Sequence, residues 1–173
     1  TSGVIINESN WLSFDWIVSD VDSLPSTLST NLRVSFYTSN GFSLYTCTYV
    51  AGEWDTASCT FNRDTDTAFA TRADFAKNAQ KSIQSFETVT TDCATFADLK
   101  GLYGRASDNC QSHFKMVFAP TLLASYTPYV TITFTGVDDY ASESTSISAL
   151  IFVKALNTPP TVWAPAIVLA GQG

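Results

Sequence analysis

The stretch YVTITFTGVDDYASESTSISALIFVKALNTPP, residues 129–160, decides the predicted fold. Its first part alternates apolar residues with threonines, which is the two-residue period of a half-buried β-strand. The apolar positions are Val130, Ile132 and Phe134. A polar turn follows, and a second strand then places four apolar residues on one face: Ile147, Ala149, Ile151 and Val153. The stretch therefore predicts a pair of consecutive strands in a mainly β domain.

The same stretch ends at Asn157-Thr158-Pro159-Pro160, where two prolines cannot donate to a ladder and so end the sheet. Another apolar segment, Thr161–Leu169, begins directly afterwards. A strand pair, a proline stop and a new strand are typical of the boundary between tandem repeats. We therefore expect one domain over residues 1–157, and a linker with the first strand of a following repeat over residues 158–173.

The bulk composition excludes some classes of function. With 173 residues, 45% of them apolar, the chain can fill the core of one domain. Its net charge of -7 repels phosphate backbones, so we expect no nucleic-acid partner. No stretch reaches the roughly 18 apolar residues of a membrane-spanning helix. The start Thr1-Ser2-Gly3 is not a signal peptide, which indicates a processed N-terminus or an excerpt of a longer chain.

The first third of the chain carries further strand patterns. Val4–Asn7 is a short strand, and Trp11–Ser19 alternates, with three large side chains on one face: Phe14, Trp16 and Val18. The next inward row is Leu32, Val34 and Phe36. Asn40-Gly41 predicts a hairpin with a tight two-residue turn, and a second turn at 51–53 returns the chain towards Phe61.

Four cysteines suit two disulfides and a secreted origin. The second hairpin places Cys47 and Cys59 almost opposite each other, so a cross-strand disulfide is reasonable there. For the other two we prefer the pairing Cys93–Cys110, although the sequence leaves the remaining pairings open. Asn7-Glu8-Ser9 is a glycosylation sequon, to be used if the chain is secreted.

The middle of the chain predicts helices. Five apolar residues between Arg72 and Phe86 recur at spacings of three and four, as on one helix face: Phe75, Ala76, Ala79, Ile83 and Phe86. A second short helix is expected over residues 94–103, ended by Gly104. Residues from about 64 to 107 are thus predicted to be a helical insertion in the β domain.

The order of four motifs resembles a known family. VSDVDS at 18–23 is an acidic turn, VSFYTSNGFSL at 34–44 a strand with its turn, and ATFADLKGLYG at 94–104 a short helix. The fourth is the pair of closing strands with its linker, residues 129–161. Together they resemble the cadherin-like, immunoglobulin-fold tandem repeats of giant bacterial adhesins and of large extracellular proteins of microbial eukaryotes. The resemblance covers most of the chain except about 64–92, and it implies a Greek-key β-sandwich.

In calcium-binding members of that family, acidic residues at the repeat ends share ions between neighbours. Carried over by position, the resemblance implies a calcium site whose ligands are Asp20, Asp22, Asp138 or Asp139, and Asn157. The chain departs from the family at Thr158, where the linker lacks a carboxylate, and losing a charged ligand weakens a hard-cation site. The alternative is that the turn aspartates only satisfy backbone groups.

The sequence does not predict an enzyme. It lacks the G-x-S-x-G, P-loop, G-x-G-x-x-G and H-E-x-x-H motifs, and its single histidine, His113, adjoins a strand. Asp138 and Asp139 are adjacent, so their side chains point apart and form a poor acid/base pair. No cofactor is expected other than calcium.

Aromatic residues make up 13% of the chain, and several are predicted to face outwards. Leu150 and Phe152 oppose the inward Ile151 and Val153, so either the helical insertion or another protomer is expected to cover that face. Tyr37 and Tyr45 are expected on this outer side too. Trp54 lies at a hairpin tip and is a candidate for stacking on a sugar. Trp163, just past the linker, fits a contact between successive repeats.

These observations predict an extracellular or cell-surface module with a structural or adhesive role. Packing end to end and side by side with neighbouring repeats or with copies of itself, it would build a stalk, fibre or filament. The alternative is a lectin-like, glycan-binding module that uses exposed aromatic residues. A third possibility is a non-catalytic domain attached to a secreted hydrolase.

Overall fold

The computed structural model describes residues 3–8, 10–20, 23, 27–50, 52–62, 72–91, 111–120 and 128–154, the side chains of 72–74, 90 and 91 excepted. Within these residues the chain forms nine strands and one helix. The elements are β1 (Gly3–Asn7), β2 (Leu12–Ser19), β3 (Ser29–Tyr37), β4 (Ser43–Val50), β5 (Glu53–Phe61), α1 (Arg72–Gln80), β6 (Ile83–Thr91), β7 (Gln111–Phe118), β8 (Tyr129–Val137) and β9 (Ile147–Lys154).

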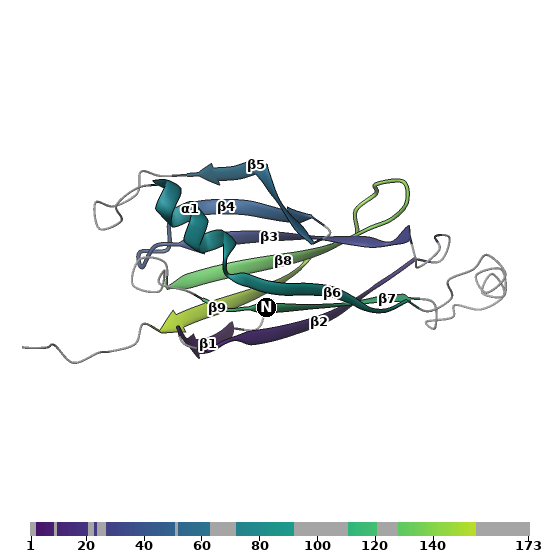
Figure 1. The fold of residues 1–173 in the computed structure, drawn as a ribbon, viewed down its shortest axis with the longest axis horizontal. Helices are drawn as coiled ribbons and strands as arrows, with labels where there is room; N and C mark the ends of the chain where they lie inside the picture. The colour runs from purple at the N-terminus through teal and green to yellow at the C-terminus, as the bar shows by residue number, and fades with distance from the viewer. Residues whose placement is uncertain are drawn as a thin grey trace, which may run out of the picture.

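The strands form two sheets that pack as a sandwich, which confirms the predicted fold class. The large sheet has the order β1-β9-β8-β3-β4-β5, and the small sheet has the order β2-β7-β6. Figure 1 shows the small sheet in front of the large one, with α1 beside it. The alternation predicted for the closing strands is present, because Val130, Ile132 and Ile151 are all buried between the sheets.

The strand order corresponds to that of a variable-type immunoglobulin domain. In such domains strands B, E and D belong to one sheet, and strands G, F, C, C′ and C″ belong to the other. Here β2, β7 and β6 take the first set of positions, and β9, β8, β3, β4 and β5 take the second. β1 does not join the small sheet but pairs in parallel with β9, from Gly3 opposite Leu150 to Asn7 opposite Lys154.

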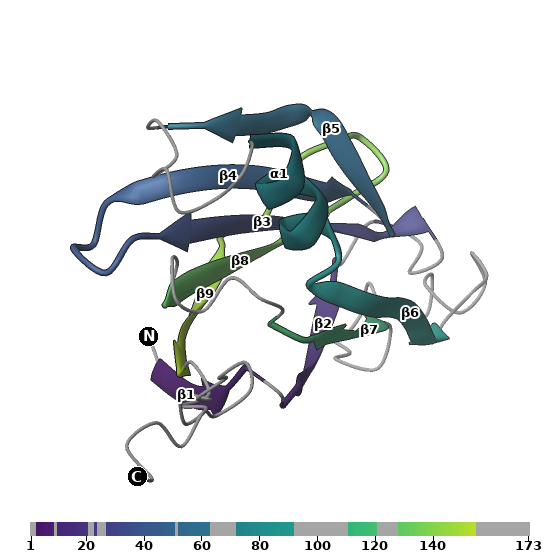
Figure 2. The same cartoon turned by 60° about the vertical axis from the view of Figure 1, so that its left-hand side comes forward.

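The helix α1 fills the part of the core that the small sheet does not cover. Its Phe75 is fully buried and meets Phe36, Tyr45 and Phe61 of the large sheet, at ring-centroid distances of 6.0, 5.6 and 5.7 Å. These rings lie on the inner face of β3, β4 and β5, towards the helix. Figures 1 and 2 both show α1 on the same side of the large sheet as β6, which follows it in the chain.

The predicted helix over 72–86 is correct only to Gln80, because β6 begins at Ile83. A β-bulge explains the error. β6 pairs with β7 as Ile83 opposite Phe118 and then Ser85 opposite Val117, so one extra residue is inserted. The bulge puts Ile83 and Phe86 on the same inner face at a spacing of three, which is also the spacing along a helix face. The segment 83–91 is therefore a strand of the small sheet and not part of a helical insertion.

Both predicted hairpins are present, with one difference in turn length. β3 and β4 are joined by residues 38–42, a longer loop than the two-residue turn predicted from Asn40-Gly41. The Gly41 backbone has a positive φ of 83°, which suits glycine. β4 and β5 are joined by the two-residue turn 51–52 between the paired residues Val50 and Glu53.

Several predictions fall outside the described residues. These are the second helix over 94–103, the pairing Cys93–Cys110, the ligands Asp22 and Asn157, the linker, Trp163, and the following strand over 161–169. In the part of the chain that the structure describes, no helix is long and apolar enough to cross a membrane.

Candidate functional site

A row of large apolar side chains crosses four strands on the outer face of the large sheet. Tyr37 pairs with Tyr129, Tyr129 pairs with Phe152, and Phe152 pairs with Ile5, so the four residues are in register across β3, β8, β9 and β1. Leu150 lies two positions before Phe152 and so projects from the same face. We call Tyr37, Tyr129, Phe152, Ile5 and Leu150 the outer apolar row.

The outer apolar row is accessible to solvent, most of all at its β1 end. Ile5 is 71% exposed and Leu150 38% exposed, while Tyr129 and Phe152 are half-buried against each other with ring centroids 5.2 Å apart. A contiguous exposed apolar surface on a folded domain is typical of an interaction site. The structure thus agrees with the predicted outward orientation of Leu150 and Phe152.

The surroundings of the row are mainly hydroxyl groups, with the exposed cations Arg33 of β3 and Lys154 of β9 on the same face. Hydroxyl groups of neighbouring strands pair on this face, as in Thr133 with Ser148 at 3.0 Å and Ser35 with Thr46 at 3.2 Å. The outer face of the small sheet differs, because charged residues pair there across strands: Asp15 opposite Lys115, and Glu87 opposite Lys115. The border of the row is thus mostly uncharged, and its charged members are Lys154 and Arg33.

The interpretation that the helical insertion covers the outer face is wrong for α1. Phe75 of α1 contacts the inner face of the large sheet, and the helix completes the inner layer beside β6. Tyr45, which was expected outside, is buried in that layer. The outer apolar row is therefore not covered by α1, the helix that the structure describes.

Trp54 is not the exposed ring that the hairpin tip suggested. It is half-buried and packs edge-on against Tyr49, with ring centroids 5.1 Å apart. Its indole N–H donates a hydrogen bond of 2.8 Å to the backbone carbonyl of Gln80 at the end of α1. Trp54 thus connects the β4–β5 hairpin to the helix. The prediction that Trp54 stacks on a sugar assumed an exposed ring, whereas the ring is half-buried.

The acidic turns predicted as a calcium site do come together. The Ser23 hydroxyl lies 3.0 Å from Oδ2 of Asp20 and 2.9 Å from Oδ1 of Asp139, so it joins the loop after β2 to the loop between β8 and β9. Asp138 instead accepts backbone hydrogen bonds from Tyr140 and Ser142, at 2.9 and 2.8 Å. Asp138 thus satisfies backbone groups of its own turn, which is the alternative to metal binding given above.

Among the described residues, no three His, Cys, Asp or Glu side chains converge as a metal site would require. Asp22 and Asn157 lie outside those residues. Calcium binding therefore stays a prediction.

A groove opens where β2 faces the first residues of β9. Its volume is about 430 Å³, and it is lined by Phe14, Asp15, Trp16, Ile17, Val18, Ser19, Phe134, Thr135, Gly136, Ser144, Thr145, Ile147, Ser148 and Ala149. Trp16 and Phe134 form its floor, with ring centroids 4.8 Å apart. Ile147 on the β9 wall is 72% exposed. Sequence reasoning missed this groove, since the groove exists only because of which strands pair.

β2 packs closely on β8 at one part of this groove. A Cβ atom at Gly136 would lie 2.7 Å from Cγ1 of Val18, so only glycine fits without a shift. The Gly136 N–H donates to the Ser144 hydroxyl at 2.9 Å, which fixes the start of the loop before β9.

The glycosylation sequon begins at the last residue of β1. Asn7 is exposed, and its carbonyl accepts a hydrogen bond from the Asn10 N–H at 2.9 Å. Asn7 and the exposed Trp11 line a shallow depression together with Lys154. This placement leaves room for an N-linked glycan, whose presence stays a prediction.

The structure contains the disulfide between Cys47 and Cys59, the cross-strand pair expected from the sequence. Their Cα atoms are 4.1 Å apart. The pairing of β4 and β5 shifts register between Thr46 and Thr48, and Cys59 lies in the part of β5 that bulges out there. The bridge thus fastens an irregular edge strand to the core, because Cys47 is fully buried.

Comparison with known proteins adds no function to this description. No family model matches the chain, and no curated protein matches it. Among solved structures, one similar chain comes from a study titled as photo-crosslinking analyses of multimeric cell-adhesive interactions of VGSC beta subunits. The match covers 91% of this chain and 93% of that chain, with 6% identity and a TM-score of 0.31. A likeness this low transfers no function.

Proposed function

We propose that this chain is a structural or adhesive module of a long extracellular surface protein, and that copies of it pack side by side. The outer apolar row supports this proposal: it is exposed, lies in register across four strands, and is not covered by α1. The occupant that fits is the same row of a second copy, because both surfaces would be apolar and bordered mainly by hydroxyl groups.

The size of the row indicates weak pairing that repetition strengthens. Burying one Ile or Leu side chain completely contributes about 1.5–3 kcal/mol. Association of two molecules costs at least about 4 kcal/mol in lost freedom of motion. A pair of such modules is therefore bound weakly, whereas modules tethered in tandem gain from a high effective concentration.

The extracellular location is supported by the disulfide. Disulfides persist in oxidising compartments and are rare in the cytosol. The bridge between Cys47 and Cys59 is consistent with a secreted or surface protein.

The proposal is tested by introducing arginine side chains into the outer apolar row. We expect the double variant Ile5→Arg/Leu150→Arg to associate at least tenfold more weakly than the wild type in sedimentation velocity over a concentration series. Val89→Arg is the matched control, because Val89 is exposed on the small sheet, away from the row. Electron microscopy of the native protein should show rods or filaments. Wild-type protein that stays monomeric and dispersed at all concentrations would overturn the proposal.

A further inference from the structure

The small sheet leaves one strand position unfilled in the part of the chain that the structure describes. In immunoglobulin domains the sheet that contains strands B, E and D also contains strand A, next to B. Here β1 pairs with β9 instead, so β2, in the B position, has a strand only on its β7 side. The free edge of a strand is a template for another strand.

The groove lies directly beside this free edge. Phe14, Trp16 and Val18 project from β2 towards it and are half-buried, and Ile147 forms the opposite wall. The pairing of β1 with β9 starts only at Leu150, so among described residues the first three residues of β9 pair with β8 alone. An added strand would find backbone hydrogen bonds on its edge and apolar side chains below it.

The chain supplies a segment of suitable chemistry beyond β9. Residues 155–173 follow the last described residue, Lys154, and contain no charged side chain. In an extended strand over 161–169, Trp163, Ile167 and Leu169 share one face, and the other face carries the smaller Val162, Ala164, Ala166 and Val168. A strand that is apolar on both faces, with its larger side chains on one of them, suits a position between an aromatic groove and the apolar wall at Ile147.

The proline within this segment is compatible with strand addition. Pro165 has no N–H, so it must point its nitrogen away from the strand that it joins. The backbone N–H and C=O groups of successive residues point to alternate sides of a strand. Pro165 therefore points its backbone to the same side as Trp163 and Ile167. The even-numbered residues can then make all the hydrogen bonds to the edge of β2.

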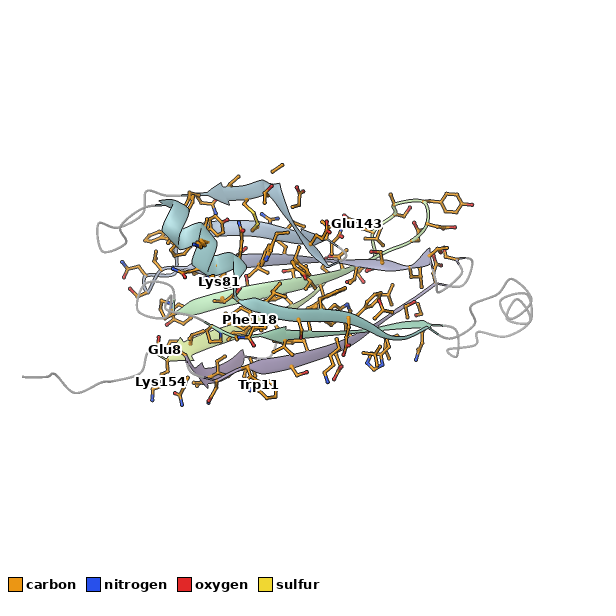
Figure 3. The ribbon with its side chains drawn as sticks, in the orientation of Figure 1. Glu8, Trp11, Lys81, Phe118, Glu143 and Lys154 are labelled. Carbon is orange, nitrogen blue, oxygen red and sulfur yellow. A yellow bond between two sulfur atoms is a disulfide. The ribbon has the colours of Figure 1, made fainter. Side chains whose placement is uncertain are left out.

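The direction of the chain favours insertion into a second copy. The groove lies at the start of β9, whereas the chain leaves at its end, and eight residues of strand span about 25 Å. Figure 3 shows Lys154 towards one end of the long axis and Glu143, in the loop before β9, towards the other. A tail at one end and a groove at the other make a head-to-tail contact, which extends into a chain of copies.

From these observations we propose that residues 161–169 of one copy add as a strand beside β2 in the groove of the next copy. This inference deepens the proposed function and rests on it, because it names the segment that joins modules end to end. Lateral packing through the outer apolar row is a separate contact, so each can fail without the other.

The test uses chains of residues 1–173 that all carry Ile5→Arg/Leu150→Arg, so that lateral packing is removed. In this parent, Ile147→Arg blocks the groove, and Ile167→Asp places a charge on the buried face of the tail. Tyr140→Arg and Gln172→Asp are matched controls, since Tyr140 is exposed in the neighbouring loop without lining the groove and Gln172 lies outside the strand segment. Sedimentation velocity measures the assembly state, and denaturant midpoints check that each variant is folded.

We expect the parent and both controls to associate more weakly than the wild type but still to form head-to-tail oligomers that lengthen with concentration, and each blocking variant to be monomeric. A 1:1 mixture of the two blocked variants should form a dimer that does not extend, because one intact tail and one intact groove remain. The proposal is overturned if the parent is monomeric, if Ile147→Arg assembles like the parent, or if the mixture stays monomeric. The last result is expected when the groove takes the tail of its own chain or another segment.

Discussion

Trp16 of β2 and Phe134 of β8 lie 4.8 Å apart between their ring centroids, and they join the two sheets. β2 and β8 hold the B and F positions, which carry the inter-sheet disulfide in antibody domains. Here aromatic rings take the place of that disulfide. Phe14, Phe86 and Phe114 surround the pair at centroid distances of 5.5 to 6.0 Å. The Trp16 N–H is satisfied by the Thr30 hydroxyl at 3.0 Å.

This relationship predicts that Trp16 is essential for stability. We expect Trp16→Ala to lower the free energy of unfolding by about 3–5 kcal/mol, since a large side chain leaves the space between the sheets. Trp16→Phe should lose less, about 1 kcal/mol, because it keeps a ring but removes the hydrogen bond to Thr30. Denaturant unfolding followed by circular dichroism measures both values. Trp11→Ala is the control: Trp11 is exposed, and a loss above about 0.5 kcal/mol there would make the comparison invalid.

The sequence predicts the closing strands well because they follow the simplest rule. Alternation of one apolar and one polar residue has a single structural meaning in β8, where Val130 and Ile132 are buried as predicted. In β6 the bulge puts Ile83 and Phe86, which are three residues apart, on the same face. A spacing of three is also found along one face of a helix. The sequence predicts a stripe, but it cannot decide between a helix and a bulged strand.

The candidate sites depend more on tertiary structure. The partner of Trp54 is a carbonyl at the end of a helix 26 residues away, so the local hairpin pattern could not predict its burial. The groove exists because β1 pairs with β9 rather than with β2. The apolar pattern of β1 does not by itself decide between these two edges. The outward orientation of Leu150 and Phe152 could be predicted, because it follows from alternation alone.

A substitution at Gly136 tests whether the two sheets approach each other closely at this position. We expect Gly136→Ala to lower the free energy of unfolding by about 1–3 kcal/mol, because its Cβ atom would overlap Cγ1 of Val18. Combining it with Val18→Ala should lower stability by less than the sum of the two single changes, with a coupling of at least about 0.5 kcal/mol. Gly3→Ala is the matched control, since nothing lies within 4 Å of a Cβ atom there. Simple additivity of the two changes would contradict the overlap.

Tyr45 is expected to make stability depend on alkaline pH. Burial raises the pKa of Tyr45 above its ordinary value of 10.0, and the Gln80 side chain offsets part of that rise. A raised folded-state pKa means that the stabilising contribution is complete below about pH 10 and is lost as the pH rises through the folded-state value. We therefore expect unfolding midpoints to fall above pH 10, and to fall less steeply in Tyr45→Phe.

The same variant should be at least as stable as the wild type at neutral pH. The Tyr45 hydroxyl is the one buried side-chain oxygen in the described part of the chain without a hydrogen-bond partner of good geometry. Removing an unsatisfied buried group is expected to stabilise the fold by about 1 kcal/mol. Tyr140→Phe serves as the control, because Tyr140 is 80% exposed. A clear loss of stability in Tyr45→Phe would show that the hydroxyl does have a partner.

Ser23 links two loops through two carboxylates. We expect Ser23→Ala to lower the free energy of unfolding by about 1–2 kcal/mol, because Asp20 and Asp139 lose a shared donor and face each other. Adding Asp139→Asn should recover part of the loss by removing the like charge. Calcium titration of the same proteins separates the two interpretations of this turn. A rise in the unfolding temperature that Asp139→Asn abolishes would place the ion here, and no rise would leave the turn role alone.

The disulfide between Cys47 and Cys59 should stabilise the β4–β5 edge. It closes a loop of 12 residues, for which the chain-entropy estimate is about 3 kcal/mol. We expect Cys47→Ala/Cys59→Ala to lose about that much, and reduced wild-type protein to lose a similar amount in denaturant unfolding. Hydrogen exchange should locate the loss in β5, an edge strand of the large sheet. Equal protection of β5 with and without reductant would mean that Trp54 and Phe61 hold the strand without the bridge.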